Sequence, residues 1–145
     1  LSDLIRKEIK KRGWEENRDN LIKTGNQLRK KYGADILAKW TMQEVGEKAV
    51  IDSIRNVKEI EFLKTQKNFI LLAIDAPIEI RYQRSKKRGR NESASSLEEF
   101  IQKETQELSG SEIQQQLKKC MNMADFLIIN DGAIEELHRK LEKFL

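Results

Sequence analysis

The stretch KAVIDSIRN, residues 48–56, is the segment from which we predict the fold of this chain. Within it, residues 49–51 are apolar and run without a polar break into Asp52, and Arg55 follows three positions later. A continuous apolar run is typical of a parallel strand covered by helices on both faces, because a half-exposed strand would alternate. The stretch therefore predicts a buried parallel strand that ends at Asp52.

Asp52 and Arg55 would lie where open parallel sheets bind their ligands, at the carboxyl ends of the strands. An aspartate there can hold Mg²⁺ directly or through water, and an arginine can grip a phosphate with two hydrogen bonds. A helix cap and a surface cation explain the same two residues equally well. Both interpretations stay open on this stretch alone.

Two further strands are predicted by the apolar runs NFILLAID, residues 68–75, and ADFLII, residues 124–129. Helical spacing of apolar residues fills most of the chain between and around these runs. Strands separated by a helix form a parallel crossover, which is right-handed in nearly all known proteins. We therefore predict an α/β fold in which helices are layered on a small parallel sheet.

The composition fits one soluble, helix-rich domain spanning residues 1–145, since 38% of residues are hydrophobic and 36% are charged. The 28 basic and 24 acidic residues give a net charge of +4 and mostly alternate in sign, as on a solvated surface. Cys120 is the only cysteine, which excludes an internal disulfide and favours a reducing compartment. With no apolar stretch of membrane-spanning length and no signal peptide, the predicted location is the cytoplasm, away from membranes.

One strongly basic run, RYQRSKKRGR at residues 81–90, carries six cations and no acid. A run of this kind can bind nucleic acid or a polyphosphate. The run alone does not distinguish these two ligands.

Four segments in order, SDLIR (2–6), IDSIR (51–55), RSKKR (84–88) and ADFLIINDG (124–132), resemble those of P-loop nucleoside monophosphate kinases. The resemblance is strongest to adenylate-kinase-like proteins related to dephospho-CoA kinase. It implies a three-layer α/β/α fold with a parallel sheet. It also implies an ATP-dependent phosphotransferase that acts on a small nucleotide and uses Mg²⁺.

The resemblance also assigns residues to the acceptor nucleotide. Arg6 would bind the acceptor phosphate, Asp3 would position the acceptor, and Arg55 would clamp the same phosphate. Arg29 would join this site, and Asp52 would act in catalysis next to the magnesium ion. Phosphoryl transfer needs positioning and dispersed positive charge more than covalent chemistry, which explains the arginines.

By the same resemblance, Arg84 and Arg88 on the donor side, which are four residues apart and so share one helical face, would neutralise the transferred phosphoryl group. The segment at about residues 89–95 would be a short lid. The turn formed by Asn130, Asp131 and Gly132 would border the adenine of ATP. The expected partner is thus a small-molecule nucleotide rather than nucleic acid.

The phosphate-binding loop of that family, G-x-x-x-x-G-K-[ST], is missing, because the chain has no Gly-Lys pair. The central strand that leads into this loop would be absent as well. We expect a full kinase that is truncated at its N-terminus, in agreement with the missing initiator Met. The alternatives are a strand supplied by another segment or chain, a hydroxyl kinase like dephospho-CoA kinase, and a non-catalytic relative that binds nucleotides or nucleic acid.

Overall fold

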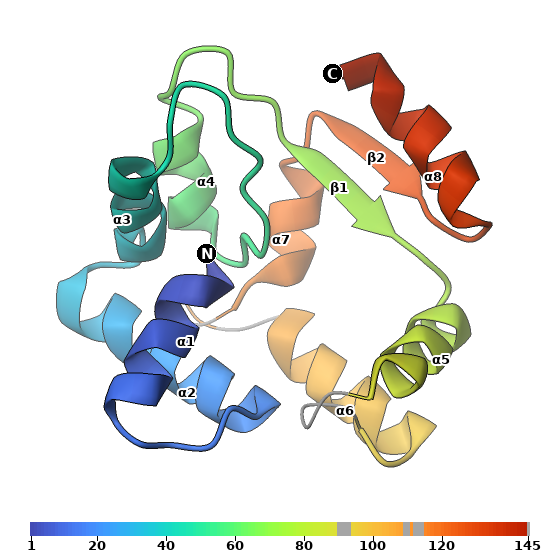
Figure 1. Ribbon diagram of the computed structural model, residues 1–145, viewed down its shortest axis with the longest axis horizontal. Helices are drawn as coiled ribbons and strands as arrows, with labels where there is room; N and C mark the ends of the chain where they lie inside the picture. The colour runs from blue at the N-terminus through green and yellow to red at the C-terminus, as the bar shows by residue number, and fades with distance from the viewer. Residues whose placement is uncertain (90–93, 109–110, 112–114, 145) are drawn as a thin grey trace.

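The structure is a computed structural model that describes residues 1–89, 94–108, 111 and 115–144. These residues form a mixed α/β fold in which helices surround a small parallel sheet (Figure 1). The elements are, in chain order, α1 (Ser2–Lys11), α2 (Arg18–Tyr32), α3 (Ile36–Glu44), α4 (Val57–Leu63), β1 (Leu72–Asp75), α5 (Ile78–Arg88), α6 (Leu97–Leu108), α7 (Leu117–Asn122), β2 (Phe126–Ile129), α8 (Ile134–Leu141) and the 3₁₀ turn η1 (Glu142–Phe144).

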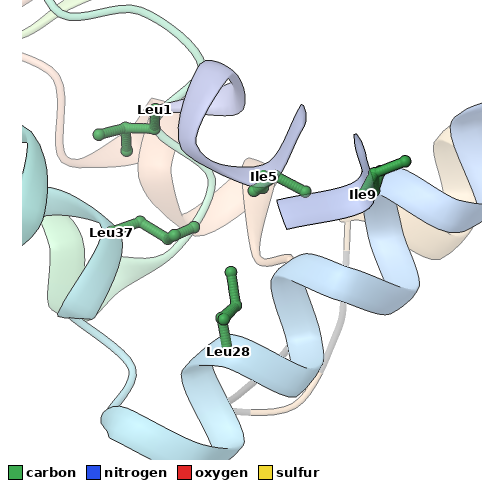
Figure 2. Packing of buried hydrophobic residues seen from close by; sticks show 5 residues of the cluster. All are labelled: Leu1, Ile5, Ile9, Leu28 and Leu37. Atoms are coloured by element: carbon green, nitrogen blue, oxygen red, sulfur yellow. The ribbon is translucent and has the colours of Figure 1, made fainter. Parts of the chain in front are cut away.

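The first three helices pack around one apolar cluster. Ile5 and Ile9, four residues apart on α1, face Leu28 of α2 and Leu37 of α3 (Figure 2). Leu1 completes the buried set, and every member is at most 9% exposed. Spacing of four residues puts side chains on one face of a helix, so this cluster follows directly from the sequence pattern.

β1 and β2 pair in parallel, with Leu72 opposite Phe126 and Asp75 opposite Ile129. Both strands lie inside the apolar runs at residues 68–75 and 124–129, so these two strand predictions and their parallel pairing are confirmed. A second buried cluster, formed by Ile60 of α4, Leu71 and Cys120 of α7, anchors the sheet to the helices.

The predicted strand at residues 48–52 is wrong. This segment is a loop in which the Val50 side chain is 91% exposed and Ser53 adopts the left-handed backbone conformation, with φ of 61°. The Asp52 carbonyl accepts a hydrogen bond from the amino group of Leu1 at 3.0 Å, and the Arg55 carbonyl accepts one from the amide of Gln116 at 2.7 Å. Residues 48–52 therefore pair with neither strand of the described sheet.

Residues 112–114, between α6 and α7, lie outside the described part of the chain. The same holds for residues 90–93 of the predicted lid. No described helix is long and apolar enough to span a membrane. The three-layer arrangement on a larger sheet stays a prediction.

Candidate functional site

A polar pocket at the start of α1 brings together residues that are distant in sequence. Its lining is Ser2, Asp3, Arg6, Glu16 and Asp52, and its volume is about 390 Å³. Three of these residues, Asp3, Arg6 and Asp52, are among the site residues predicted from the sequence. The pocket therefore joins two of the four predicted acceptor-binding residues, Asp3 and Arg6, to the predicted magnesium ligand Asp52.

The left-handed turn at Ser53 helps to form this pocket. It follows Asp52 directly, and the Ser53 hydroxyl lies 3.5 Å from the Ser2 hydroxyl at the start of α1. A non-glycine residue with positive φ is uncommon and costs free energy, so it needs support from its surroundings. Here the turn leaves the Asp52 side chain 83% exposed at the edge of the pocket.

Charge in the polar pocket is dominated by carboxylates. Asp3, Glu16 and Asp52 are acidic, and Arg6 is the only arginine or lysine in the lining. The Arg6 guanidinium forms an ion pair with Glu16, and its side chain is 24% exposed. An acidic pocket with one arginine suits a ligand that carries both a cation and an anion.

Arg29, another predicted acceptor residue, lies in the core and does not reach the polar pocket. Its Nε and one terminal nitrogen contact Oε1 of Glu59 at 2.9 and 2.8 Å, and both side chains are at most 2% exposed. The other Glu59 oxygen accepts the backbone N–H groups of Arg55 and Asn56 at 3.0 and 3.1 Å. Glu59 was not predicted from the sequence, although the spacing from Asn56 to Glu59 is that of a capping box.

Arg55 points toward the start of α7 instead of the polar pocket. One of its guanidinium nitrogens lies 3.2 Å from the Gln115 side-chain oxygen, and its backbone is tied to Glu59 and Gln116. Asp52 and Arg55 are thus close in sequence, but Asp52 lines the polar pocket and Arg55 contacts Gln115. The assignment of Arg55 to an acceptor phosphate remains a prediction.

Arg84 and the loop after β2, both predicted on the donor side, meet at a second place. The Arg84 guanidinium donates to the backbone carbonyls of Asn130 and Gly132 at 2.7 and 2.9 Å, which ties α5 to the loop after β2. Arg88 is exposed in the last turn of α5, and Asp131 pairs with Lys140 at 3.7 Å. Figure 1 shows this loop and the start of α1 on separate parts of the molecule. The structure therefore brings Asp3, Arg6 and Asp52 together in one place and Arg84 and the loop after β2 together in another, whereas Arg29 and Arg55 lie in neither.

Neither a nucleophilic thiol nor a dedicated metal cluster is found in the described part of the chain. Burial and the nearby Glu59 carboxylate raise the pKa of the Cys120 thiol to about 11, so the thiol stays protonated at neutral pH. Among the described residues, no three or more His, Cys, Asp or Glu side chains are grouped as metal ligands. Asp3 and Asp52 still offer carboxylate oxygens at the polar pocket.

Several archaeal proteins are similar to the whole of this chain. It is 35% identical over 153 residues to a UPF0200/UPF0201 protein of Archaeoglobus fulgidus, and it spans 46% of that protein. It is 30% identical to a UPF0200 protein of Sulfurisphaera tokodaii and 33% identical to one of Methanosarcina barkeri, and it spans 79% and 82% of these. No protein-family model matches the chain.

These similarities correct one prediction from the sequence. The relatives that match the full chain carry UPF0200 names and none of those described above has a kinase name. The identification of the chain as a member of the P-loop nucleoside monophosphate kinase family is therefore wrong. The ordered segments that suggested it are short, and the family's phosphate-binding loop is not among them.

Proposed function

The chain belongs to the UPF0200 family. We propose that its polar pocket binds the phosphate of a small nucleotide together with Mg²⁺. We propose further that this nucleotide is the acceptor in an ATP-dependent phosphotransfer. The observation that carries the proposal is the convergence of Asp3, Arg6 and Asp52 in one pocket. The pocket contains an arginine, which can bind a phosphate, and two aspartates, which can bind Mg²⁺.

Each side chain has a distinct task in this proposal. The planar Arg6 guanidinium can hold two phosphate oxygens at once. Asp3 and Asp52 supply carboxylate oxygens, and Mg²⁺ is commonly held by one or two carboxylates together with substrate phosphates and water. Mg²⁺ would neutralise phosphate charge that the acidic pocket repels. The charge balance therefore favours a magnesium–nucleotide complex over a bare phosphate.

In the absence of nucleotide, the Glu16 carboxylate would occupy the position at Arg6 that the nucleotide phosphate takes when it binds. It now pairs with Arg6, and its side chain is 54% exposed, so the pair can open without burying a charge. Exposed ion pairs contribute only about 0–1 kcal/mol, a small cost for a phosphate that forms a stronger contact. We expect Glu16→Gln to bind the nucleotide more tightly than the wild type, since it weakens the competing contact.

The chemical nature of the acceptor group decides whether a base is required. A monophosphate oxygen is already anionic and needs none, whereas a hydroxyl acceptor, as in dephospho-CoA, needs a carboxylate to take its proton. Asp3 is exposed at the pocket and is the best candidate. Asp3→Asn would then reduce transfer to a hydroxyl far more than transfer to a monophosphate, and equal small losses would remove the base assignment.

Nucleic-acid binding by the basic run has less support. Arg81 pairs with Glu104 at 3.0 Å, and Arg84 bonds to the loop after β2. These contacts engage two of the six cations that would otherwise face a phosphate backbone. A binding role would leave the exposed side chains at the end of α5, Lys86, Lys87 and Arg88, as its main contacts.

A titration with AMP, with and without Mg²⁺, tests the proposed function. We expect Mg²⁺ to strengthen binding, Arg6→Ala to weaken it at least tenfold, and Asp52→Asn to remove most of the Mg²⁺ effect. Arg139→Ala is the matched control, because Arg139 is exposed on α8 and is not part of the pocket. Equal AMP affinity in Arg6→Ala and the wild type would contradict the proposal.

A further inference from the structure

A groove between α1, α2 and α3 is separate from the polar pocket. Its volume is about 670 Å³, and none of its lining residues belongs to the polar pocket. The helices that form it lie together in the N-terminal part of the chain (Figure 1). We call it the helix groove, and the lining residues that matter here are Leu4, Lys11, Leu28, Lys31, Tyr32 and Trp40.

One part of the helix groove is apolar. Leu28 belongs to the buried cluster of the first three helices, and Leu4 and Trp40 pack against that cluster. The Tyr32 ring lies 5.3 Å from the Trp40 ring, and Tyr32 is 47% exposed. A half-exposed tyrosine ring next to apolar side chains offers a surface on which another flat ring can pack.

The charged residues of the groove are unequal in number. The lining contains four cations and two carboxylates, which leaves an excess of two positive charges. Glu44 pairs with Lys7 at 3.0 Å, and Glu8 pairs with Arg12 at 2.9 Å. Both carboxylates therefore have a partner, and two cations remain.

These two cations are Lys11 and Lys31. Both side chains are exposed, and neither forms an ion pair with another residue in the described part of the chain. The Lys31 ammonium lies 4.7 Å from the centroid of the Tyr32 ring. An anion that pairs with Lys31 would therefore lie beside an exposed aromatic ring, and Lys11 would add to the attraction.

We propose that the helix groove binds an organic anion that has a flat aromatic body and one carboxylate, sulfonate or phosphate group. The aromatic body would pack on Tyr32 and the apolar residues, and the anionic group would pair with Lys31. This site goes beyond the proposed nucleotide site and does not depend on it.

The size of the groove favours a small molecule over a protein partner. Small-molecule sites have volumes of about 300–1,000 Å³, with apolar walls and a few polar groups that orient the ligand. The helix groove, at about 670 Å³, lies in that range. A stable protein partner would need a contact surface of about 800 Å² on each side, which extends well beyond a groove of this size.

An NMR titration with 8-anilinonaphthalene-1-sulfonate, an aromatic sulfonate, tests the inference. We expect saturable shifts at the Trp40 indole N–H and at the backbone amides of residues 4–12 and 27–32. The amides of β1 and β2 are the internal control, because exposed apolar side chains there could also attract the aromatic body. N-phenyl-1-naphthylamine, which has the same aromatic body without the sulfonate, should bind at least tenfold more weakly.

Charge variants identify the cations. Lys11→Ala combined with Lys31→Ala should weaken binding of the sulfonate at least tenfold. The matched control is Lys10→Ala combined with Lys30→Ala, which changes the net charge equally. Lys10 and Lys30 are exposed neighbours on the same two helices and do not line the groove, so this variant should bind nearly as well as the wild type.

Variants of Tyr32 test the aromatic contact. Tyr32→Leu keeps an apolar side chain and removes the ring, so it should weaken binding of the sulfonate at least threefold. Tyr32→Phe keeps the ring and should bind like the wild type. Tyr32 is half exposed, so neither change should unfold the chain.

Four results would overturn the inference. The first is an equal loss of affinity in the two double lysine variants, and the second is equal binding of N-phenyl-1-naphthylamine. The third is a set of saturable shifts at β1 and β2 in place of the helix groove. The fourth is displacement of the sulfonate by AMP with Mg²⁺, which would place it in the polar pocket. Failure of AMP to bind would contradict the proposed function alone.

Discussion

Removing Arg29 should destabilise the fold severely, because it would leave the Glu59 carboxylate buried without its cation. In Arg29→Met the carboxylate keeps two backbone N–H groups, at 3.0 and 3.1 Å, and loses guanidinium contacts at 2.9 and 2.8 Å. Breaking a buried ion pair on one side typically costs about 3–5 kcal/mol. A domain has a total stability of only about 5–15 kcal/mol.

Urea denaturation followed by circular dichroism measures this loss. With a slope of about 1–3 kcal/mol per M of urea, the midpoint should fall by about 1 M or more. Lys7→Met is the matched control, because Lys7 and Glu44 pair at 3.0 Å with side chains 61% and 56% exposed. Exposed pairs contribute about 1 kcal/mol or less, so this midpoint should change little.

The double variant separates the ion pair from the helix cap. Arg29→Met combined with Glu59→Gln should lose less stability than the sum of the single variants, since the second change removes the orphaned charge. Glu59 also accepts the backbone N–H groups before α4, so the double variant should stay below the wild type. A loss in Arg29→Met no larger than in Lys7→Met would refute this reasoning.

Three further predictions concern the loop after β2, the cysteine and acid stability. Arg84→Ala should cost roughly 1–3 kcal/mol, because it removes charged donors from the carbonyls of Asn130 and Gly132, and faster amide exchange after β2 would show it. Cys120 should react with a thiol reagent only after unfolding, since burial raises its pKa to about 11; rapid reaction in the native state would contradict this. Hydrogen bonds from Ser95 and Lys103 lower the pKa of Glu99 to about 2, so its stabilising effect should be complete above pH 4.5 and disappear as the pH falls toward 2. An NMR titration of the Glu99 carboxyl with a midpoint near the ordinary value would contradict that assignment.

The sequence predicted the elements whose local pattern is strong. The runs at residues 68–75 and 124–129 contain the two strands, and Ile5 and Ile9 face the core as their spacing indicates. The segment at residues 48–52 failed because only three apolar residues stand between charged ones. A segment becomes a strand only where a neighbouring strand pairs with it. This depends on the tertiary structure and cannot be read from a short apolar run.

The sequence indicated which residue types could bind a phosphate or a metal ion, but not which of these residues lie next to one another. Asp3, Arg6 and Asp52 share a pocket because the turn at Ser53 meets the start of α1. Arg29 looked like a phosphate ligand, yet a buried glutamate 30 residues away binds it. An arginine has the same sequence signal in both settings, so only the position of its acidic partner distinguishes them.

An NMR titration of the chain with AMP and Mg²⁺ tests whether the polar pocket holds the nucleotide. We expect saturable chemical-shift changes at the backbone amides of the polar pocket, in residues 2–6 and 52–53 and at Glu16. The amides of α8 should stay unchanged and serve as an internal control. Binding that instead perturbs α5 and the loop after β2, or no saturable change at residues 2–6, would contradict the claim that this pocket holds the nucleotide.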